Sequence, residues 1–293
     1  GYHGWHDWYL ATNLKSESGL AEHLLPGLEP NGVPKALEGS VLSFSFNCLD
    51  QLKNIVEHNN LAAIKMEVQR SMTPDPGFLE GVRKLCTDKG IILIFDECTS
   101  GFRESFGGLH LKYGIEPDMA MFGKAIGNGY AITAIIGRRS VMEAAQSTFI
   151  SSTFWTERIG PTAALKTLEI MERDRSWDEV TNQGLRLMNA WQKLADNYNL
   201  KIQLSGLPSL CSFKFQSLKH LEYKTLITQE MLKKGYLAST TCYMSTAHTP
   251  EIIERYLEEL ESIFELIGQC EDGRLVEDLL DSPVCHSGFT RLN

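Results

Sequence analysis

The feature that most constrains the fold is the segment of residues 90–137, in which two short apolar runs each end near a charged side chain. Residues 91–95 are apolar and mostly β-branched, which is typical of a strand buried on both faces of a parallel sheet, and Asp96 follows them directly. Residues 119–122 form the second run, and a glycine and Lys124 follow it. Open α/β sheets bind their ligands at the carboxyl ends of the strands. We therefore expect Asp96 and Lys124 to face one crevice.

The neighbouring segments predict strands and helices in alternation. Residues 62–66 predict a strand that leads to Glu67, and residues 76–89 predict a helix that starts at a proline and stops at Gly90. A strand, a helix and a strand in this order form a right-handed crossover unit. Residues 131–136 predict a further buried strand. This alternation predicts an α/β large domain.

The second half of the chain predicts a smaller domain. It is mostly helical in its spacing of apolar residues, with two short strands expected at residues 201–204 and 211–215. Further helices are expected at residues 219–234 and after Thr249, which precedes a proline. Together these elements predict a small α+β domain.

The expected domain boundary lies between residues 173 and 174. Residues 1–173 would form part of the large domain, and residues 174–293 the small one. Within the first part, residues 11–40 are rich in Gly, Pro, Ser and Asn and show little periodicity, so they predict an extended loop.

The composition limits the classes of partner and location. With 293 residues, 43% of them hydrophobic, the chain can bury a large core. A net charge of −9 argues against a nucleic-acid partner or an anionic membrane surface, and no apolar run approaches the length of a membrane span. The seven cysteines are odd in number and lack a C-x-x-C motif, so a reducing cytoplasm is the default. His3 and His6 lack a third ligand nearby, so we predict no metal site.

An amine and a carboxylate that face one crevice suggest a specific chemistry. A lysine amine forms a Schiff base with an aldehyde when its surroundings keep it deprotonated often enough. The alternative is that Lys124 is a solvated loop residue and Asp96 a strand-end cap. A phosphate-binding loop at Lys124 is excluded, because that motif needs a glycine where this chain has Asp118 and a hydroxyl residue where it has Ala125.

Three runs carry a resemblance to a known family, and they read IFDECTSGFR at residues 94–103, PDMAMFGKAIGNGY at 117–130 and IIGRR at 135–139. They resemble the class III (subgroup II) pyridoxal-phosphate aminotransferases. Within this family they are most similar to the glutamate-1-semialdehyde aminomutase-like branch. The opening GYHGWHDW and the late LASTTCYMSTAHT are similar to that branch as well.

The resemblance implies a fold and a cofactor. The fold would be that of the fold-type I enzymes, with a mixed, mostly parallel sheet, helices on both of its faces and a smaller α+β C-terminal domain. The cofactor would be pyridoxal 5'-phosphate, with Lys124 as the Schiff-base lysine and Asp96 as the partner of the pyridine nitrogen.

Three further residues receive cofactor-binding roles from the resemblance, each beside a structural alternative. Tyr2 would lie against the face of the ring, or it belongs to an aromatic cluster at the edge of the core. Glu67 would be a hydrogen-bond or charge partner near the ring or substrate, or it is a simple strand-end acid. Thr153 would reach across a homodimer interface to the cofactor phosphate of the other subunit, or it is part of a Ser/Thr-rich turn.

The implied function is that of an aminotransferase, which moves an amino group from a small-molecule donor to a keto or aldehyde acceptor. The first alternative is a 2,1-aminomutase of the glutamate-1-semialdehyde type. Aminomutases of the branch carry a glutamate shortly before the late motif, whereas residues 240–244 contain no acid, so we favour an external donor. In the family, the aromatic opening segment lies in the middle of the large domain. We therefore expect a fragment without its N-terminal part, and a non-catalytic truncated homologue is the second alternative.

Overall fold

The computed structural model describes residue 3, residues 7–15 and residues 29–287 of the chain. The contacts between residues divide the chain into two compact units, one that runs to Glu169 and one that spans Ile170–Ser287. Helix α6 (Ile159–Asp174) crosses this division and ends one residue before Arg175, which has a left-handed backbone with φ of 50°. The domain boundary between residues 173 and 174 remains a prediction.

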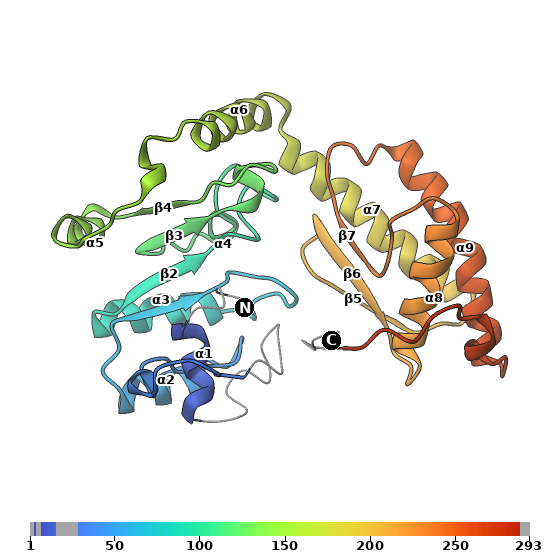
Figure 1. Cartoon of the computed structure of the whole chain (residues 1–293), viewed down its shortest axis with the longest axis horizontal. Coiled ribbons are helices and arrows are strands. Elements are labelled where there is room, and N and C mark those ends of the chain that lie inside the picture. Colours follow the sequence, from blue (N-terminus) through green and yellow to red (C-terminus); the bar gives the residue numbers. More distant parts are fainter. Residues whose placement is uncertain (1–2, 4–6, 16–28, 288–293) are drawn as a thin grey trace. The chain divides into compact units, whose positions relative to one another are not determined.

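The first unit is built on a four-stranded sheet in the order β1-β2-β3-β4 (Figure 1). Strands β1 (Ala63–Met66), β2 (Ile92–Asp96) and β3 (Met119–Phe122) are parallel, and β4 (Ala134–Gly137) pairs with β3 in the antiparallel direction. The predicted mixed, mostly parallel sheet is thus confirmed. Because the three parallel strands run in the same direction, their carboxyl ends meet at one edge of the sheet.

Helix α3 (Phe78–Lys89) connects β1 to β2, as predicted for a crossover unit. Its buried side chains recur at helical spacing, which gives the helix one apolar face. Gly90 ends the helix with φ of 67°, a conformation that glycine adopts without strain. The apolar side chains of β2 are buried, and Leu93 and Phe95 are fully enclosed.

The prediction of a buried strand over residues 131–136 was wrong in its position and in its burial. The strand is β4 (Ala134–Gly137), and it forms the antiparallel edge of the sheet. Ile135 and Ile136 are 49% and 58% exposed. An apolar run reports the tendency to form a strand, but it does not report whether another part of the chain covers that strand.

The remaining elements of the first unit are short. Part of the extended loop predicted for residues 11–40 is helical instead, because α1 runs to residue 15 and a one-turn 3-10 helix forms at Lys35–Leu37. The other helices are α1 (Asp7–Lys15), α2 (Leu49–His58), α4 (His110–Tyr113) and α5 (Arg139–Met142), with 3-10 helices at Lys124–Ile126, Glu143–Ser147 and Thr153–Thr156.

The second unit is the predicted α+β arrangement. Strands β5 (Ile202–Ser205), β6 (Leu210–Phe215) and β7 (Thr241–Tyr243) form an antiparallel sheet. Helices α7 (Ser176–Asn197), α8 (His220–Lys233) and α9 (Pro250–Glu271) pack with it (Figure 1), and a 3-10 helix follows at Val276–Leu279. The core contains Trp191, whose ring lies 4.8 Å from that of Phe213 and whose Nε1 donates to the Tyr256 hydroxyl at 3.1 Å.

Candidate active site

Asp96 is the last residue of β2, and its carboxylate lies among three donors. Oδ2 is 2.8 Å from Nδ1 of His3 and 3.4 Å from Nζ of Lys65. Oδ1 accepts a hydrogen bond of 3.2 Å from the Cys98 amide. Asp96 is only 6% exposed, so its charge interacts mainly with these groups.

The environment of Asp96 keeps the carboxylate ionised. Burial acts to raise its pKa, but the hydrogen bond and the charge of His3, the charge of Lys65 and the Cys98 amide together hold the pKa well below its ordinary value. An ionised carboxylate at this position is suited to accept a charge-assisted hydrogen bond from a protonated nitrogen of a ligand.

Lys124 follows the carboxyl end of β3, the strand next to β2. Its Nζ donates to Oγ1 of Thr99 at 3.2 Å, and Thr99 lies three residues after Asp96 in the turn that follows β2. A Cβ added to Gly123 would lie 3.3 Å from Sγ of Cys98, so the glycine allows the end of β3 to approach that turn. The turn from Asp96 to Thr99 thus connects the predicted acid to the predicted amine.

The backbone of Lys124 has an unusual conformation. Its φ of 48° lies in the left-handed region, which costs a residue other than glycine about 1–2 kcal/mol. Strained residues of this kind occur at functional sites, where the surrounding structure holds them in place.

Glu67 lies directly after β1, and it is buried with 8% exposure. Its Oε1 is 2.9 Å from Nη1 of Arg70. The same Arg70 nitrogen lies 3.4 Å from Oγ1 of Thr99, the oxygen that also accepts from Lys124. The ends of the three parallel strands therefore place Glu67, Asp96 and Lys124 at one edge of the sheet.

The structure does not bring Thr153 to this group. Thr153 begins an exposed 3-10 helix, in which the Ser152 hydroxyl accepts from the Phe154 amide. None of the hydrogen bonds between the described residues joins Thr153 to Asp96 or Lys124. Tyr2 lies outside the described residues, so its predicted role is not addressed by the structure.

Four residues that contact this group were not predicted from the sequence, namely His3 and Lys65 beside Asp96, Thr99 beside Lys124, and Arg70 beside Glu67 and Thr99. His3 was considered only as a possible metal ligand. Lys65 carried a usable signal, because a lysine within an apolar strand needs an acid nearby. Thr99 carried no comparable signal, because a threonine shortly after a strand is an ordinary turn residue and does not indicate a contact with Lys124.

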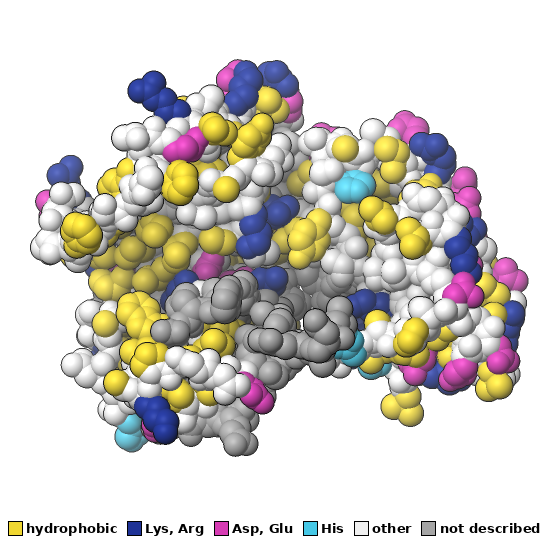
Figure 2. All heavy atoms as spheres, viewed as in Figure 1, with side chains coloured by type: hydrophobic (Ala, Val, Ile, Leu, Met, Phe, Trp, Pro, Cys, Tyr) yellow, Lys and Arg dark blue, Asp and Glu magenta, His cyan; other side chains and the backbone are white. Residues whose placement is uncertain are grey.

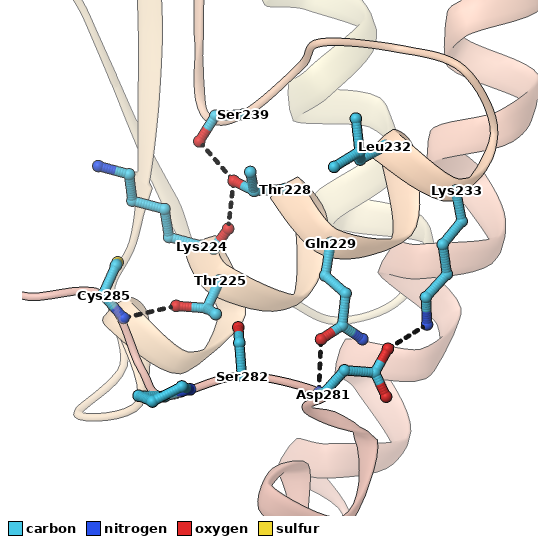
Figure 3. Close-up of a pocket in the computed structure, with 11 residues that line it drawn as sticks. Lys224, Thr225, Thr228, Gln229, Leu232, Lys233, Ser239, Asp281, Ser282 and Cys285 are labelled. Atoms are coloured by element: carbon cyan, nitrogen blue, oxygen red, sulfur yellow. Dashed lines mark hydrogen bonds and ion pairs between the residues drawn. The ribbon is translucent and has the colours of Figure 1, made fainter.

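A separate cavity of about 740 Å³ lies in the second unit, between α8 and residues 281–285 (Figure 3). Its polar side chains are largely engaged with one another, since Thr228 bonds to Ser239, and both Gln229 and Lys233 contact Asp281. This cavity contains none of the residues predicted for the site.

Two features are absent from the described residues. No group of three or more His, Cys, Asp or Glu side chains in the described ranges could hold a metal ion. Among the described helices, none combines the length and the apolar character needed to cross a membrane.

Known proteins resemble this chain over most of its length. A family model described as aminotransferase class-III matches residues 1–266. The chain is 34% identical over 287 residues to a 3-aminobutyryl-CoA aminotransferase from Cloacimonas acidaminovorans (strain Evry), a match that covers 90% of this chain and 64% of the relative. It is 29% identical over 287 residues to a glutamate-1-semialdehyde 2,1-aminomutase from Methanocaldococcus jannaschii, with 90% and 66% covered. The chain thus spans less than two thirds of the length of each relative.

Solved structures with the same fold were also found. The FumI protein of Sphingopyxis sp. MTA144, in its PLP internal aldimine form, aligns with a TM-score of 0.78 at 20% identity and covers 93% of this chain and 70% of its own. An omega-transaminase from Sphaerobacter thermophilus aligns with a TM-score of 0.76 at 22% identity, with 90% and 66% covered. At these identities the alignments establish the fold.

Proposed function

The chain belongs to the class-III aminotransferases, and from this premise we propose that it carries the pyridoxal-phosphate site of an enzyme that moves an amino group from a donor to a keto or aldehyde acceptor. The observation that supports this most directly is the turn from Asp96 to Thr99. It holds a buried, ionised carboxylate at the end of β2 and accepts a hydrogen bond from the amine of Lys124 at the end of β3.

The residues present fit this cofactor by their chemistry. An aldehyde requires an amine, which Lys124 supplies at the exposed edge of the sheet. A pyridine nitrogen that must stay protonated requires an ionised carboxylate, which Asp96 supplies with the help of its cationic neighbours. The hydroxyl of Thr99, which accepts from Lys124, would be a donor or acceptor for a polar group on the ring.

Each residue would have a definite task. When bound, the cofactor supplies an aldehyde for amines and a ring that takes up electron density. Asp96 holds the proton on the ring nitrogen, while His3 and Lys65 hold Asp96 in its ionised form. Lys124 would hold the cofactor through its aldehyde, and its Nζ, when free, would move a proton at the substrate carbon that carries the amino group. Thr99 orients Nζ through its hydrogen bond.

The test is borohydride reduction of the protein after addition of pyridoxal phosphate, followed by peptide mapping. We expect the reduced cofactor on Lys124 and no labelling of that peptide in a Lys124→Ala variant. Lys65, the other lysine near Asp96, serves as the internal comparison. Labelling of Lys65 or of any other lysine in place of Lys124 would overturn the assignment.

The remaining assignments extend this proposal. Tyr2 would stack on the ring, Glu67 would act as a polar partner through Arg70, and Thr153 would contact the phosphate in a partner subunit. A homodimer is supported by exposed apolar side chains in the first unit, and Figure 2 shows such side chains gathered over the region of β3, β4 and α6. The exposed residues from this part of the chain include Phe149, Ile150, Phe154, Trp155, Ile159 and Leu165. A cytoplasmic location is supported by the seven cysteines, all of which are free thiols.

A 2,1-aminomutase on the same scaffold is the second candidate, supported by the likeness to the aminomutase of M. jannaschii. The lack of an acid in residues 240–244 favours the aminotransferase. The two functions separate by their substrate requirement, because a mutase converts a single substrate and needs no second carbonyl compound. If the borohydride experiment finds no cofactor on any lysine, a non-catalytic homologue becomes the better description.

A further inference from the structure

We propose that Arg70 binds the carboxylate of an amino-acid or keto-acid substrate beside Lys124. This proposal rests on the aminotransferase function above and adds to it the chemical class of one substrate. It assigns a specificity role to a residue that follows β1 and had no predicted function.

The position of Arg70 supports this role. Its Nη1 lies 3.4 Å from Oγ1 of Thr99, and Nζ of Lys124 lies 3.2 Å from the same oxygen. The guanidinium and the reactive amine therefore cannot lie further apart than the sum of these two distances. In an α- or β-amino acid, the carboxylate is two or three bonds from the amino group. A substrate amine that replaces Nζ of Lys124 would therefore bring its carboxylate within reach of Arg70.

The guanidinium also has unused capacity. Among the described residues, both contacts of Arg70 are made by Nη1, one to Glu67 and one to Thr99. The nitrogens Nε and Nη2 are left to donate to a ligand. Arginine binds carboxylates through two parallel hydrogen bonds, which makes it the preferred residue for this class of group. The side chain of Arg70 is 29% exposed, against 8% for that of Glu67, so the guanidinium is the more accessible member of the pair.

The alternative is that Arg70 serves only to neutralise Glu67. In that case, replacing Arg70 would lower the stability of the protein and would not change its discrimination between a charged and an uncharged ligand. A carboxylate and its amide analogue therefore separate the two roles.

The experiment measures the dissociation constants of succinate and succinamide by calorimetry, on the chain loaded with pyridoxal phosphate. We expect succinate to bind the wild type more tightly than succinamide. Arg70→Gln should weaken succinate binding by about tenfold to a hundredfold, because a hydrogen bond to a charged group is lost. Binding of succinamide should change little. Arg70→Lys keeps the charge but loses the paired donors, so its dissociation constant for succinate should lie between those of the wild type and Arg70→Gln.

Arg186→Gln is the matched control, since Arg186 is an exposed arginine of α7 in the second unit. It should leave both dissociation constants at their wild-type values, and thermal unfolding of each variant would establish that it is folded. Equal succinate affinity in the wild type and Arg70→Gln would overturn the proposal, as would a wild type that does not bind succinate. Borohydride labelling of Lys124 in the same preparations distinguishes failure of the Arg70 proposal from failure of the proposed function. If Lys124 is labelled and Arg70→Gln binds succinate as the wild type does, only the role of Arg70 is refuted. If Lys124 is not labelled, the proposed function itself is refuted.

Discussion

Replacement of Asp96 by asparagine tests the site most directly, because it removes one charge and nearly preserves the shape of the side chain. In the wild type the carboxylate is 6% exposed and faces His3, Lys65 and the Cys98 amide. Loss of one partner from a buried charge pair costs about 3–5 kcal/mol. Applied to the interaction with a protonated ring nitrogen, this predicts a single-turnover rate lower by about a hundredfold to several thousandfold.

The effect of Asp96→Asn on stability should be smaller. The Lys65 side chain is 29% exposed, so its ammonium can turn toward water when the carboxylate is lost. We therefore expect a loss of about 1–3 kcal/mol in the free energy of unfolding at neutral pH. The folded-state pKa of Asp96 lies below its unfolded value of about 3.9, so its contribution is present above that value and is lost as the pH falls through the folded pKa. The difference in unfolding free energy between the wild type and Asp96→Asn should thus be fully present at about pH 5 and shrink below about pH 4.

Asp118→Asn is the control, because Asp118 is another buried carboxylate with two cationic partners. It lies before β3, at the opposite end of that strand from Lys124. Its oxygens are 3.1 Å from Nη1 of Arg83 and 3.0 Å from Nη1 of Arg138, and one accepts from the Leu93 amide at 2.7 Å. This variant should lose about 3 kcal/mol of stability and retain the wild-type single-turnover rate, measured by cofactor absorbance with an amino donor that the wild type accepts. Our interpretation fails if folded, cofactor-loaded Asp96→Asn reacts as fast as the wild type, or if Asp118→Asn is equally slow.

Two further predictions concern other parts of the chain. In α7, a Cβ on Gly184 would lie 1.8 Å from a carbonyl oxygen of the turn before β6, so Gly184→Ala should destabilise the second unit by about 1–3 kcal/mol, measured by urea titration. In α9, the nearest atom to a Cβ on Gly268 is 3.4 Å away, so Gly268→Ala should be neutral or slightly stabilising in that titration. Equal losses of stability in the two variants would contradict the packing of α7 against this turn. Burial, followed by the charge of Asp96, raises the pKa of the Cys98 thiol to about 11, which leaves about a thousandth of it as thiolate at pH 8. Iodoacetamide should therefore modify the exposed Cys48 well before Cys98 in a time course followed by mass spectrometry. Comparable rates of modification at the two cysteines would refute this prediction.

Much of the first unit could be predicted from local sequence. Strand β3 was expected at residues 119–122 and is found there, and β2 was displaced by one residue. These strands were predictable because each is a short apolar run between a turn signal and a polar residue. The same runs placed Asp96 and Lys124 at neighbouring strand ends, since parallel strands share one direction.

The contacts around these two residues could not be predicted from local patterns. The bond from His3 to Asp96 joins residues 93 positions apart, and that from Arg70 to Thr99 joins residues 29 positions apart. Such contacts depend on how loops pack at the edge of the sheet, and no periodicity encodes that packing. The exposure of β4 was missed for a related reason, because hydrophobicity alone does not identify which elements cover a strand.

The left-handed backbone of Lys124 has a consequence for engineering. Glycine or asparagine adopts this conformation more easily than lysine, so replacing the lysine should make the chain more resistant to heat. A directed-evolution screen that rewards only survival at high temperature would then discard the amine on which the proposed chemistry depends. Any such screen therefore needs a simultaneous selection for the retention of pyridoxal phosphate.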